Sequence, residues 1–262
     1  MHSQPIDVPS PFSLAGKTAL VTGGSRGIGL MIARGFVEAG ANVYISSRKK
    51  ETCDAVAAEL SAIGPCIALP ADLSSGDECA RLAGELRTRE SKLDILVNNA
   101  GAAWGAALGE FPESGFDKVL DINVKAVFLL TQACLPMLEA AGTQADPARV
   151  INIGSIDGIQ VPEVDTFSYS ASKAAVHHMT EVLAVKLAGK HVTVNAIAPG
   201  PFESKMTEWM LANFRSSYES RCPVGRIGEP GDMAGVAIYL ASRAGAYVNG
   251  VIIPVDGGLR LV

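Results

Sequence analysis

Tyr169 and Lys173 form the residue pair best suited to chemistry in this 262-residue chain. Four residues of α-helix turn through ~400°, so the two side chains would lie within ~40° of each other on one helix face. A free tyrosine has a pKa of ~10, too high for efficient proton exchange at neutral pH. An ammonium ~4 Å away would lower that pKa by at most ~3 units. The pair therefore predicts a phenol that exchanges a proton with a carbonyl or alcohol oxygen, although the same spacing is common on solvated helices.

A glycine-rich turn is the second candidate for chemistry. Thr22-Gly-Gly-Ser-Arg-Gly-Ile-Gly29 follows a short apolar strand and leads directly into a helical pattern. Glycines let the backbone approach a pyrophosphate, and the helix N-terminus offers free N–H groups to it. The spacing of Gly23, Gly27 and Gly29 departs from the general GxGxxG fingerprint, and a tight turn without a ligand is the alternative. Its place after the first strand favours a dinucleotide-binding turn.

The elements that must position these residues alternate regularly along the chain. Strands are predicted at 18–21, 42–46, 66–69, 94–97, 149–153, 192–197 and 251–255, and helices at 28–39, 51–63, 77–90, 116–138, 169–187 and 231–240. Strands and helices that alternate with short connections predict an α/β fold, a parallel sheet covered by helices on both faces. We expect one domain over 14–262, a flexible leader at 1–13 and a substrate lid at about 200–228.

Composition and charge exclude several classes of function. A net charge of -5 gives no electrostatic reason to bind nucleic acid or an anionic membrane. The best membrane candidate, 126–138, is interrupted by Gln132 and Pro136, so no spanning helix is expected. The five cysteines are scattered, and the histidines lack metal-ligand spacing. The sequence predicts a cytoplasmic protein with reduced thiols and no metal.

Several ordered motifs resemble the classical short-chain dehydrogenase/reductase family. They are Thr22-Gly23-x-x-x-Gly27-x-Gly29, Asn98-Asn99-Ala100-Gly101 and Tyr169-x-x-x-Lys173, with Asp72, Asn123, Ser155 and Pro199-Gly200 as further matches between and after them. The resemblance covers about 14–259. It implies a Rossmann-type, doubly wound sheet of seven parallel strands and an oxidoreductase that uses a nicotinamide cofactor.

The resemblance also implies roles for a catalytic set of four residues. Tyr169 would be the proton donor or acceptor, and Lys173 would tune it and hold the nicotinamide ribose. Ser155 would hydrogen bond to the substrate oxygen and stabilise the developing alkoxide. The backbone of Asn123 would hold a water that links Lys173 to solvent. Without the family, Ser155 would equally fit a local capping serine and Asn123 a polar interruption of a helix.

The remaining family positions are expected cofactor contacts. They are Gly23, Ser25, Arg26, Gly27, Ile28 and Gly29 in the turn, Ser47 and Arg48 after the second strand, Asp72 and Leu73, Asn99, Ala100 and Gly101, Tyr169 and Lys173, and Pro199, Gly200, Phe202 and Ser204. Ser204 stands where threonine is usual in the family.

The end of the second strand indicates which nicotinamide cofactor binds. An acid there accepts a hydrogen bond from the ribose 2′-hydroxyl and selects NAD, whereas arginine accommodates a 2′-phosphate. Here Ser47 occupies the acid position and Arg48 follows it, while the family pattern directs Arg26 into the same corner. Two guanidiniums suit a doubly charged phosphate. We predict NADP(H); the alternative is that 48–50 is only a solvated loop.

The expected substrate is hydrophobic. No cluster of acids or arginines occurs in the segments expected to surround the substrate. These segments are 103–104, 156–161 and the apolar part of the lid (Phe202, Met206, Trp209 and Met210). Within the family the chain is most similar to the NADPH-dependent 3-oxoacyl reductases of rhamnolipid synthesis, which implies reduction of a 3-oxoacyl thioester. The alternatives are a reductase of steroid-like or xenobiotic carbonyls and a non-catalytic dinucleotide-binding regulator. The family also implies a homotetramer or homodimer packed through the helices at 116–138 and 169–187.

Overall fold

Seven parallel strands make the central sheet of the computed structural model, which describes residues 10–262. Their order is β3-β2-β1-β4-β5-β6-β7, as the doubly wound topology predicts. Their bounds are β1 Thr18–Thr22, β2 Asn42–Ser46, β3 Cys66–Ala68, β4 Ile95–Asn98, β5 Ala148–Ile153, β6 Val192–Pro199 and β7 Ile252–Val255. The central strands β1, β4, β5 and β6 are buried along their whole length, because helices cover both of their faces. The predicted fold class is confirmed.

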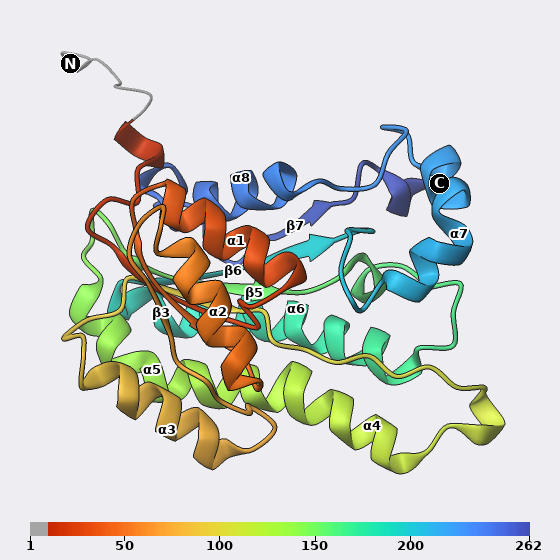
Figure 1. The fold of residues 1–262 in the computed structure, drawn as a ribbon, viewed down its shortest axis with the longest axis horizontal. Helices are drawn as coiled ribbons and strands as arrows, with labels where there is room; N and C mark the ends of the chain where they lie inside the picture. Colours follow the sequence, from red (N-terminus) through yellow and green to blue (C-terminus); the bar gives the residue numbers. More distant parts are fainter. Residues whose placement is uncertain (1–9) are drawn as a thin grey trace.

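Helices form a layer on each side of the sheet (Figure 1). Their bounds are α1 Gly27–Glu38, α2 Lys50–Leu60, α3 Gly76–Arg87, α4 Glu113–Leu120, α5 Ala126–Ala141, α6 Phe167–Leu187, α7 Glu208–Arg221 and α8 Pro230–Ala241. One hydrophobic core joins the sheet to α1, α2 and α8, and a second joins it to α3, α5 and α6. The chain crosses from one layer to the other after β3, which opens a crevice at the carboxyl ends of β1 and β4.

The predicted helix at 116–138 is not one regular helix. Between α4 and α5 the chain forms a π-helical turn, Asp121–Lys125. By length and composition alone the helical segment Glu113–Ala141 could cross a membrane, contrary to the sequence-based expectation. In this fold its apolar residues are used in the second core, where Leu130, Cys134 and Leu138 are buried.

The predicted lid at 200–228 contains a helix, α7, which the sequence pattern did not reveal. Its apolar residues do not follow a helical period, and only Leu211 is buried. Of the predicted leader, residues 1–9 lie outside the described residues. Ser10–Phe12 form a 3-10 turn, and Leu14 is fully buried in the first core.

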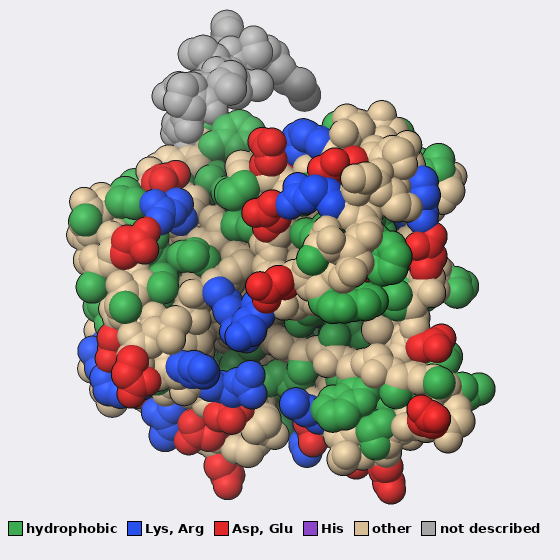
Figure 2. All heavy atoms as spheres, turned by 45° about the vertical axis from the view of Figure 1, so that its right-hand side comes forward, with side chains coloured by type: hydrophobic (Ala, Val, Ile, Leu, Met, Phe, Trp, Pro, Cys, Tyr) green, Lys and Arg blue, Asp and Glu red, His purple; other side chains and the backbone are tan. Residues whose placement is uncertain are grey.

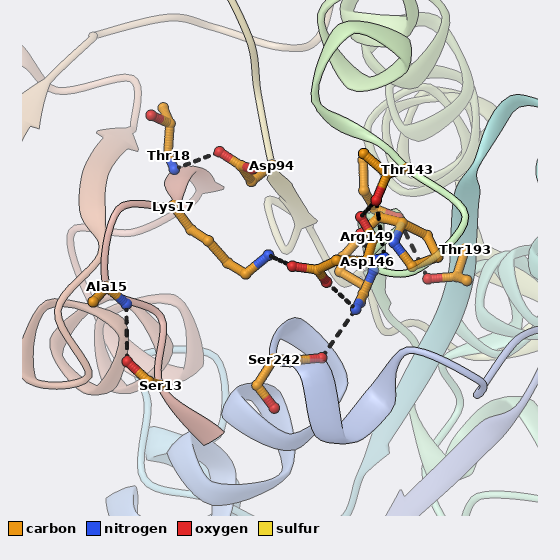
Figure 3. A network of polar contacts seen from close by, with 12 residues as sticks. Ser13, Ala15, Lys17, Thr18, Asp94, Thr143, Asp146, Arg149, Thr193 and Ser242 are labelled. Atoms are coloured by element: carbon orange, nitrogen blue, oxygen red, sulfur yellow. Dashed lines mark hydrogen bonds and ion pairs between the residues drawn. The ribbon is translucent and has the colours of Figure 1, made fainter. Parts of the chain in front are cut away.

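The buried guanidinium of Arg149 links the amino end of β5 to the end of α8 (Figure 3). The amino ends of the strands lie on the side of the sheet opposite the crevice. Arg149, at the start of β5, donates to Asp146 Oδ1 at 2.9 Å, to Ser242 O at 3.0 Å and to Leu240 O at 3.2 Å. Asp146 also accepts from Lys17 Nζ at 2.8 Å. Burial lowers the pKa of Arg149, and Asp146 opposes this effect. The network fixes the amino end of β5, whose carboxyl end leads to Ser155.

Candidate active site

The sheet and α6 bring Ser155, Tyr169 and Lys173 to the carboxyl end of β5. Ser155 follows β5 directly, and α6 carries the other two residues one turn apart. Lys173 Nζ donates to Ile153 O at 2.7 Å and lies 5.5 Å from the centroid of the Tyr169 ring. The Ser155 hydroxyl is close enough to the Tyr169 phenol to lower its pKa. The structure therefore brings together three of the four residues of the expected catalytic set.

Burial controls the protonation of this pair. It raises the pKa of Tyr169 to about 12; Ser155 lowers this pKa, and Asp157 raises it further. The direction is opposite to the lowering expected from the sequence, because burial of the phenol dominates. The ammonium of Lys173 donates to Ile153 O. Burial also lowers the pKa of Lys173 to about 8, and Asp157 opposes this change. Without a ligand the site thus keeps the phenol protonated.

Asn123 lies in the π-helical turn and is buried, with an exposed fraction of 1%. Its Oδ1 accepts from Ala102 N at 2.8 Å, while its Nδ2 donates to Ala102 O and to Ser172 Oγ, each at 2.9 Å. Ser172 in turn donates to Tyr169 O at 2.7 Å. The side chain of Asn123 therefore clamps the loop after β4 to the helix that carries Tyr169. In a π-turn, backbone carbonyls lack their usual α-helical partners. The predicted water relay would need such a carbonyl in the backbone of Asn123.

The glycine turn has the shape of a phosphate cradle. Gly23 and Gly27 adopt positive φ angles of 66° and 53°. A Cβ on Gly29 would lie 2.3 Å from Gly23 O, so the turn closes only without side chains. Helix α1 begins immediately at Gly27, and its N-cap residue Arg26 supplies no side-chain cap. The first N–H groups of α1 are thereby left to an anion.

Asn99 and Ala100 lock the glycine turn to the end of β4. Thr22 Oγ1 accepts from the backbone N–H groups of Asn99 and Ala100 at 2.9 and 3.0 Å and donates to Val97 O. Asn99 Nδ2 donates to Thr22 O at 2.8 Å. Gly101 follows, and a Cβ there would lie 3.1 Å from Asn123 Oδ1. The predicted ribose-side turn is thus continuous with the Asn123 clamp.

The corner after β2 fits an additional phosphate group. The buried Oγ atoms of Ser46 and Ser47 have no hydrogen-bond partner within the part of the chain that the structure describes. Arg26 and Arg48 are exposed. The nearby carboxylates of Glu59 and Asp54 are paired with Arg34 and Lys50 instead.

The other predicted cofactor residues fall into two groups. Ser25 and Ile28 lie in the glycine turn itself. The side chain of Leu73 is buried in the second core. Next to it in sequence, Asp72 Oδ1 accepts from Ser74 N. After β6, a Cβ on Gly27 would lie 2.9 Å from Ser204 Cβ, so the Pro199–Ser204 segment passes over the glycine turn. Phe202 is buried, with its ring against Gly228. Its ring is therefore not available to a nicotinamide, and its carbonyl accepts from Thr207 Oγ1 at 2.6 Å.

The mouth of the site is apolar. Three segments follow the carboxyl ends of β4, β5 and β6, at 104–116, 159–167 and 206–214, and each exposes large hydrophobic side chains, including Leu108 (78% exposed), Val161 (92%) and Trp209 (66%). Figure 2 shows hydrophobic side chains on both sides of a hollow, with Lys and Arg side chains gathered beside it. Trp104, expected at the substrate, packs on Gly115 beneath Lys118 and is partly exposed. The five cysteines are free and buried, and no cluster among residues 10–262 could hold a metal ion.

Sequence reasoning missed several residues of the site. Asp157 and His177 lie against the catalytic residues: the N–H of Asp157 donates to Ser155 Oγ at 3.1 Å, and the Ser155 N–H lies 3.4 Å from His177 Nε2. Ser172 and Thr22 carry the hydrogen bonds described above. The position of Asp157, two residues after Ser155, was the available signal. No spacing rule pointed to His177, which sits one turn beyond Lys173.

Comparisons with known proteins agree with this geometry over nearly the whole chain. A family model described as Enoyl-(Acyl carrier protein) reductase matches residues 23–260. The chain is 51% identical over 253 residues to the rhamnolipids biosynthesis 3-oxoacyl-[acyl-carrier-protein] reductase of Pseudomonas aeruginosa, covering 95% of this chain and 98% of that protein. It is 35% identical over 247 residues to the 3-oxoacyl-[acyl-carrier-protein] reductase FabG of Thermotoga maritima, covering 94% and 98%.

A solved structure agrees as well. The Pseudomonas aeruginosa RhlG/NADP active-site complex has a TM-score of 0.92 and 50% sequence identity, covering 95% of this chain and 98% of that one.

Proposed function

Because this chain belongs to the short-chain dehydrogenase/reductase family, we propose that it reduces a 3-oxoacyl thioester to the 3-hydroxyacyl product with NADPH. The family membership confirms the resemblance predicted from the ordered motifs. The observation that carries the proposal is the convergence of Ser155, Tyr169 and Lys173 at the carboxyl end of β5, beside a glycine turn that leads into a helix N-terminus without a side-chain cap. The relatives named 3-oxoacyl-[acyl-carrier-protein] reductase support the substrate class.

The chain's own residues would handle the proton. Tyr169, kept protonated by burial, donates its phenolic proton to the substrate oxygen. The Ser155 hydroxyl accepts from the N–H of Asp157, and its own O–H would donate a hydrogen bond to the same oxygen. Lys173, with a pKa of about 8, can release and regain a proton near neutral pH. Asn123 holds the loop after β4 against α6, so that the three groups keep their spacing.

The cofactor would supply the hydride, and several described residues fit it. The glycine turn would hold the pyrophosphate at the start of α1, with Asn99 and Gly101 on the ribose side. Asp72 and Leu73 would flank the adenine, and Pro199, Gly200 and the Phe202 backbone would meet the nicotinamide. Ser47, Arg48 and Arg26 would hold the 2′-phosphate, which supports NADPH over NADH. The RhlG/NADP complex supports the same choice.

The apolar mouth supports a substrate with a hydrocarbon chain. The side chains of Leu108, Val161 and Trp209 are exposed. An acyl chain that extends from the catalytic oxygen would reach them and cover their apolar surface. A steroid-like carbonyl is the remaining alternative for the same surface. The intact catalytic set argues against a non-catalytic regulator.

We also propose a soluble, cytoplasmic homotetramer or homodimer. On α5 and α6 the side chains of Phe128, Val182 and Val185 are exposed apolar groups on the helices expected to form the interface. A monomeric mass in light scattering would contradict the assembly.

The oxidation of NADPH, followed by its absorbance, tests the proposed reaction. The protein is assayed with a 3-oxoacyl thioester, an enoyl thioester, a simple diketone and no substrate, each with NADPH and with NADH. The proposal expects the highest kcat/KM for the 3-oxoacyl thioester with NADPH. Preference for the diketone would favour the general ketone reductase, and no turnover in any arm would favour the regulator.

A further inference from the structure

The loop that carries Ser155 closes on a buried imidazole, that of His177 on α6. The backbone N–H of Ser155 donates to His177 Nε2 at 3.4 Å. A Cβ on Gly154 would collide with this nitrogen, and a Cβ on Gly158 would lie 2.9 Å from His177 Cε1. The glycines on both sides of Ser155 therefore let the loop close on the ring. The ring in turn fixes the backbone from which the catalytic hydroxyl projects.

Only a neutral imidazole can accept this hydrogen bond. In the neutral ring one nitrogen carries a proton and the other has a free lone pair, whereas the imidazolium ion donates from both nitrogens. Burial and the charge of Lys173, one turn earlier on α6, lower the pKa of His177, while the Gly158 backbone and Glu181 oppose this change. At pH 7 the ring is therefore neutral, with its proton on Nδ1. A second proton at Nε2 would face the Ser155 N–H and break the bond.

The other titratable groups on and against α6 do not bond to the Ser155 backbone. Asp157 lies in the 3-10 turn Ile156–Gly158, which covers the ring, and strand β6 has no titratable side chain. His178 is the next residue on α6, but its side chain is 79% exposed and lies beside Glu181. The remaining groups, on the surface of α6 and of the elements packed against it, are exposed or partly exposed: Glu113, Asp117, Lys118, Asp121, Lys125, Lys186 and Lys190.

We propose that His177 is a positioning residue: its neutral imidazole holds the backbone of Ser155, and protonation of the ring releases the serine and slows the reaction in acid. The inference rests on the proposed reductase function. The Ser155 hydroxyl has to reach the substrate oxygen, and a displacement of ~1 Å at such a group can cost about 100-fold in rate. Because the ring contacts the backbone of this loop rather than the apolar mouth, the effect should fall mainly on kcat.

The test compares wild type with His177→Gln, His177→Leu and, as a matched control, His178→Gln. Glutamine has an oxygen that can accept the Ser155 N–H and does not titrate, whereas leucine fills the space without an acceptor. At pH 7, H177L should lower kcat for a 3-oxoacyl thioester by about 10–100-fold with KM within about threefold of wild type. H177Q should recover most of this loss, and H178Q should match wild type. Thermal unfolding checks that each variant is folded.

The pH dependence separates positioning from a merely structural role. In wild type and H178Q, kcat should fall below the midpoint of His177 titration, which lies under the ordinary histidine pKa of ~6.5. In H177Q this acid limb should be absent. The midpoint is read without substrate from the imidazole C–H resonance that is missing in H177Q. The amide resonance of Ser155, assigned in 15N-serine-labelled protein by its absence from Ser155→Ala, should move with the same midpoint.

Three results overturn the inference: an acid limb that persists unchanged in H177Q, a folded H177L with the kcat of wild type at pH 7, or a Ser155 amide that does not follow the imidazole titration. The titration of wild type needs no variant of His177 that folds. If the amide follows the imidazole but no carbonyl is turned over at any pH, the hold on Ser155 stands and the proposed function is refuted instead.

Discussion

Replacement of Asn123 by alanine tests how the active site is held together. The substitution removes three hydrogen bonds at a position that is 1% exposed: one from Ala102 N, one to Ala102 O and one to Ser172 Oγ. Each lost bond costs about 1 kcal/mol when water reaches the orphaned group and up to ~2 kcal/mol when it does not. Ala102 is half-buried and Ser172 fully buried, so the expected loss of unfolding free energy is about 3–4 kcal/mol.

Urea unfolding followed by tryptophan fluorescence measures this loss. Ser172→Ala is the matched control, because it removes the bond from Asn123 and the bond to Tyr169 O but leaves both bonds between Asn123 and Ala102 in place, and it should cost about 1–2 kcal/mol. In kinetics, Asn123→Ala should lower kcat by up to ~100-fold, because the clamp sets the spacing of Tyr169 from the loop after β4. Equal losses of stability in the two variants, or a loss below ~1 kcal/mol for Asn123→Ala, would refute the clamp.

Asn123→Asp separates the clamp from simple space filling. The carboxylate keeps the acceptor for Ala102 N but cannot donate to Ala102 O, and it is a charge in a buried position. Burial should raise its folded-state pKa above the unfolded value, so the folded protein binds the extra proton first. The stability of this variant relative to wild type should therefore rise as the pH falls. No pH dependence would contradict the buried placement.

Three further substitutions test the cofactor corner, the fold and the catalytic lysine. Arg48→Ala should raise the KM for NADPH about 5–10-fold and leave the KM for NADH unchanged, since the exposed guanidinium is expected to contact only the 2′-phosphate. Equal effects on the two KM values in steady-state kinetics would refute this assignment. Arg149→Met should cost about 3–5 kcal/mol in urea unfolding, because it leaves Asp146 Oδ1 and the carbonyls of Leu240 and Ser242 without their donor, while Lys17 still pairs with Asp146 Oδ2. A change below ~1 kcal/mol would speak against the network. Burial lowers the pKa of Lys173 to about 8, so above that pH the unfolded chain binds more protons than the folded one. Wild type should therefore gain stability relative to Lys173→Met between pH 7 and 10, on the order of 2 kcal/mol, whereas a constant difference would contradict the lowered pKa.

The layers of the fold and the place of the catalytic pair could be predicted from the sequence. Buried parallel strands appear as continuous apolar runs such as β1 and β5, and short connections between them and the helices leave few topologies. The positions of Tyr169 and Lys173 follow from helical geometry once α6 is recognised. The residues of the glycine turn are likewise fixed by their place between β1 and α1.

What could not be predicted depends on tertiary contacts. The π-turn at Asp121–Lys125 exists because Asn123 reaches Ala102 and Ser172, which are remote in sequence, and helical periodicity does not report such a bulge. Helix α7 has only one buried residue, Leu211, so its pattern resembles that of a loop. The direction of the pKa shift of Tyr169 was wrong because spacing places Lys173 on the same face but does not show that burial of the phenol dominates.

The replacement of Tyr169 by phenylalanine tests the proposed reaction most directly. NADPH binding is measured by fluorescence titration, and turnover by the loss of NADPH absorbance with a 3-oxoacyl thioester. If Tyr169 gives the proton, turnover should fall by about 10²–10⁴-fold, while the Kd for NADPH stays within about threefold of wild type, a change of under ~1 kcal/mol. Turnover within tenfold of wild type, with NADPH still bound, would contradict the account.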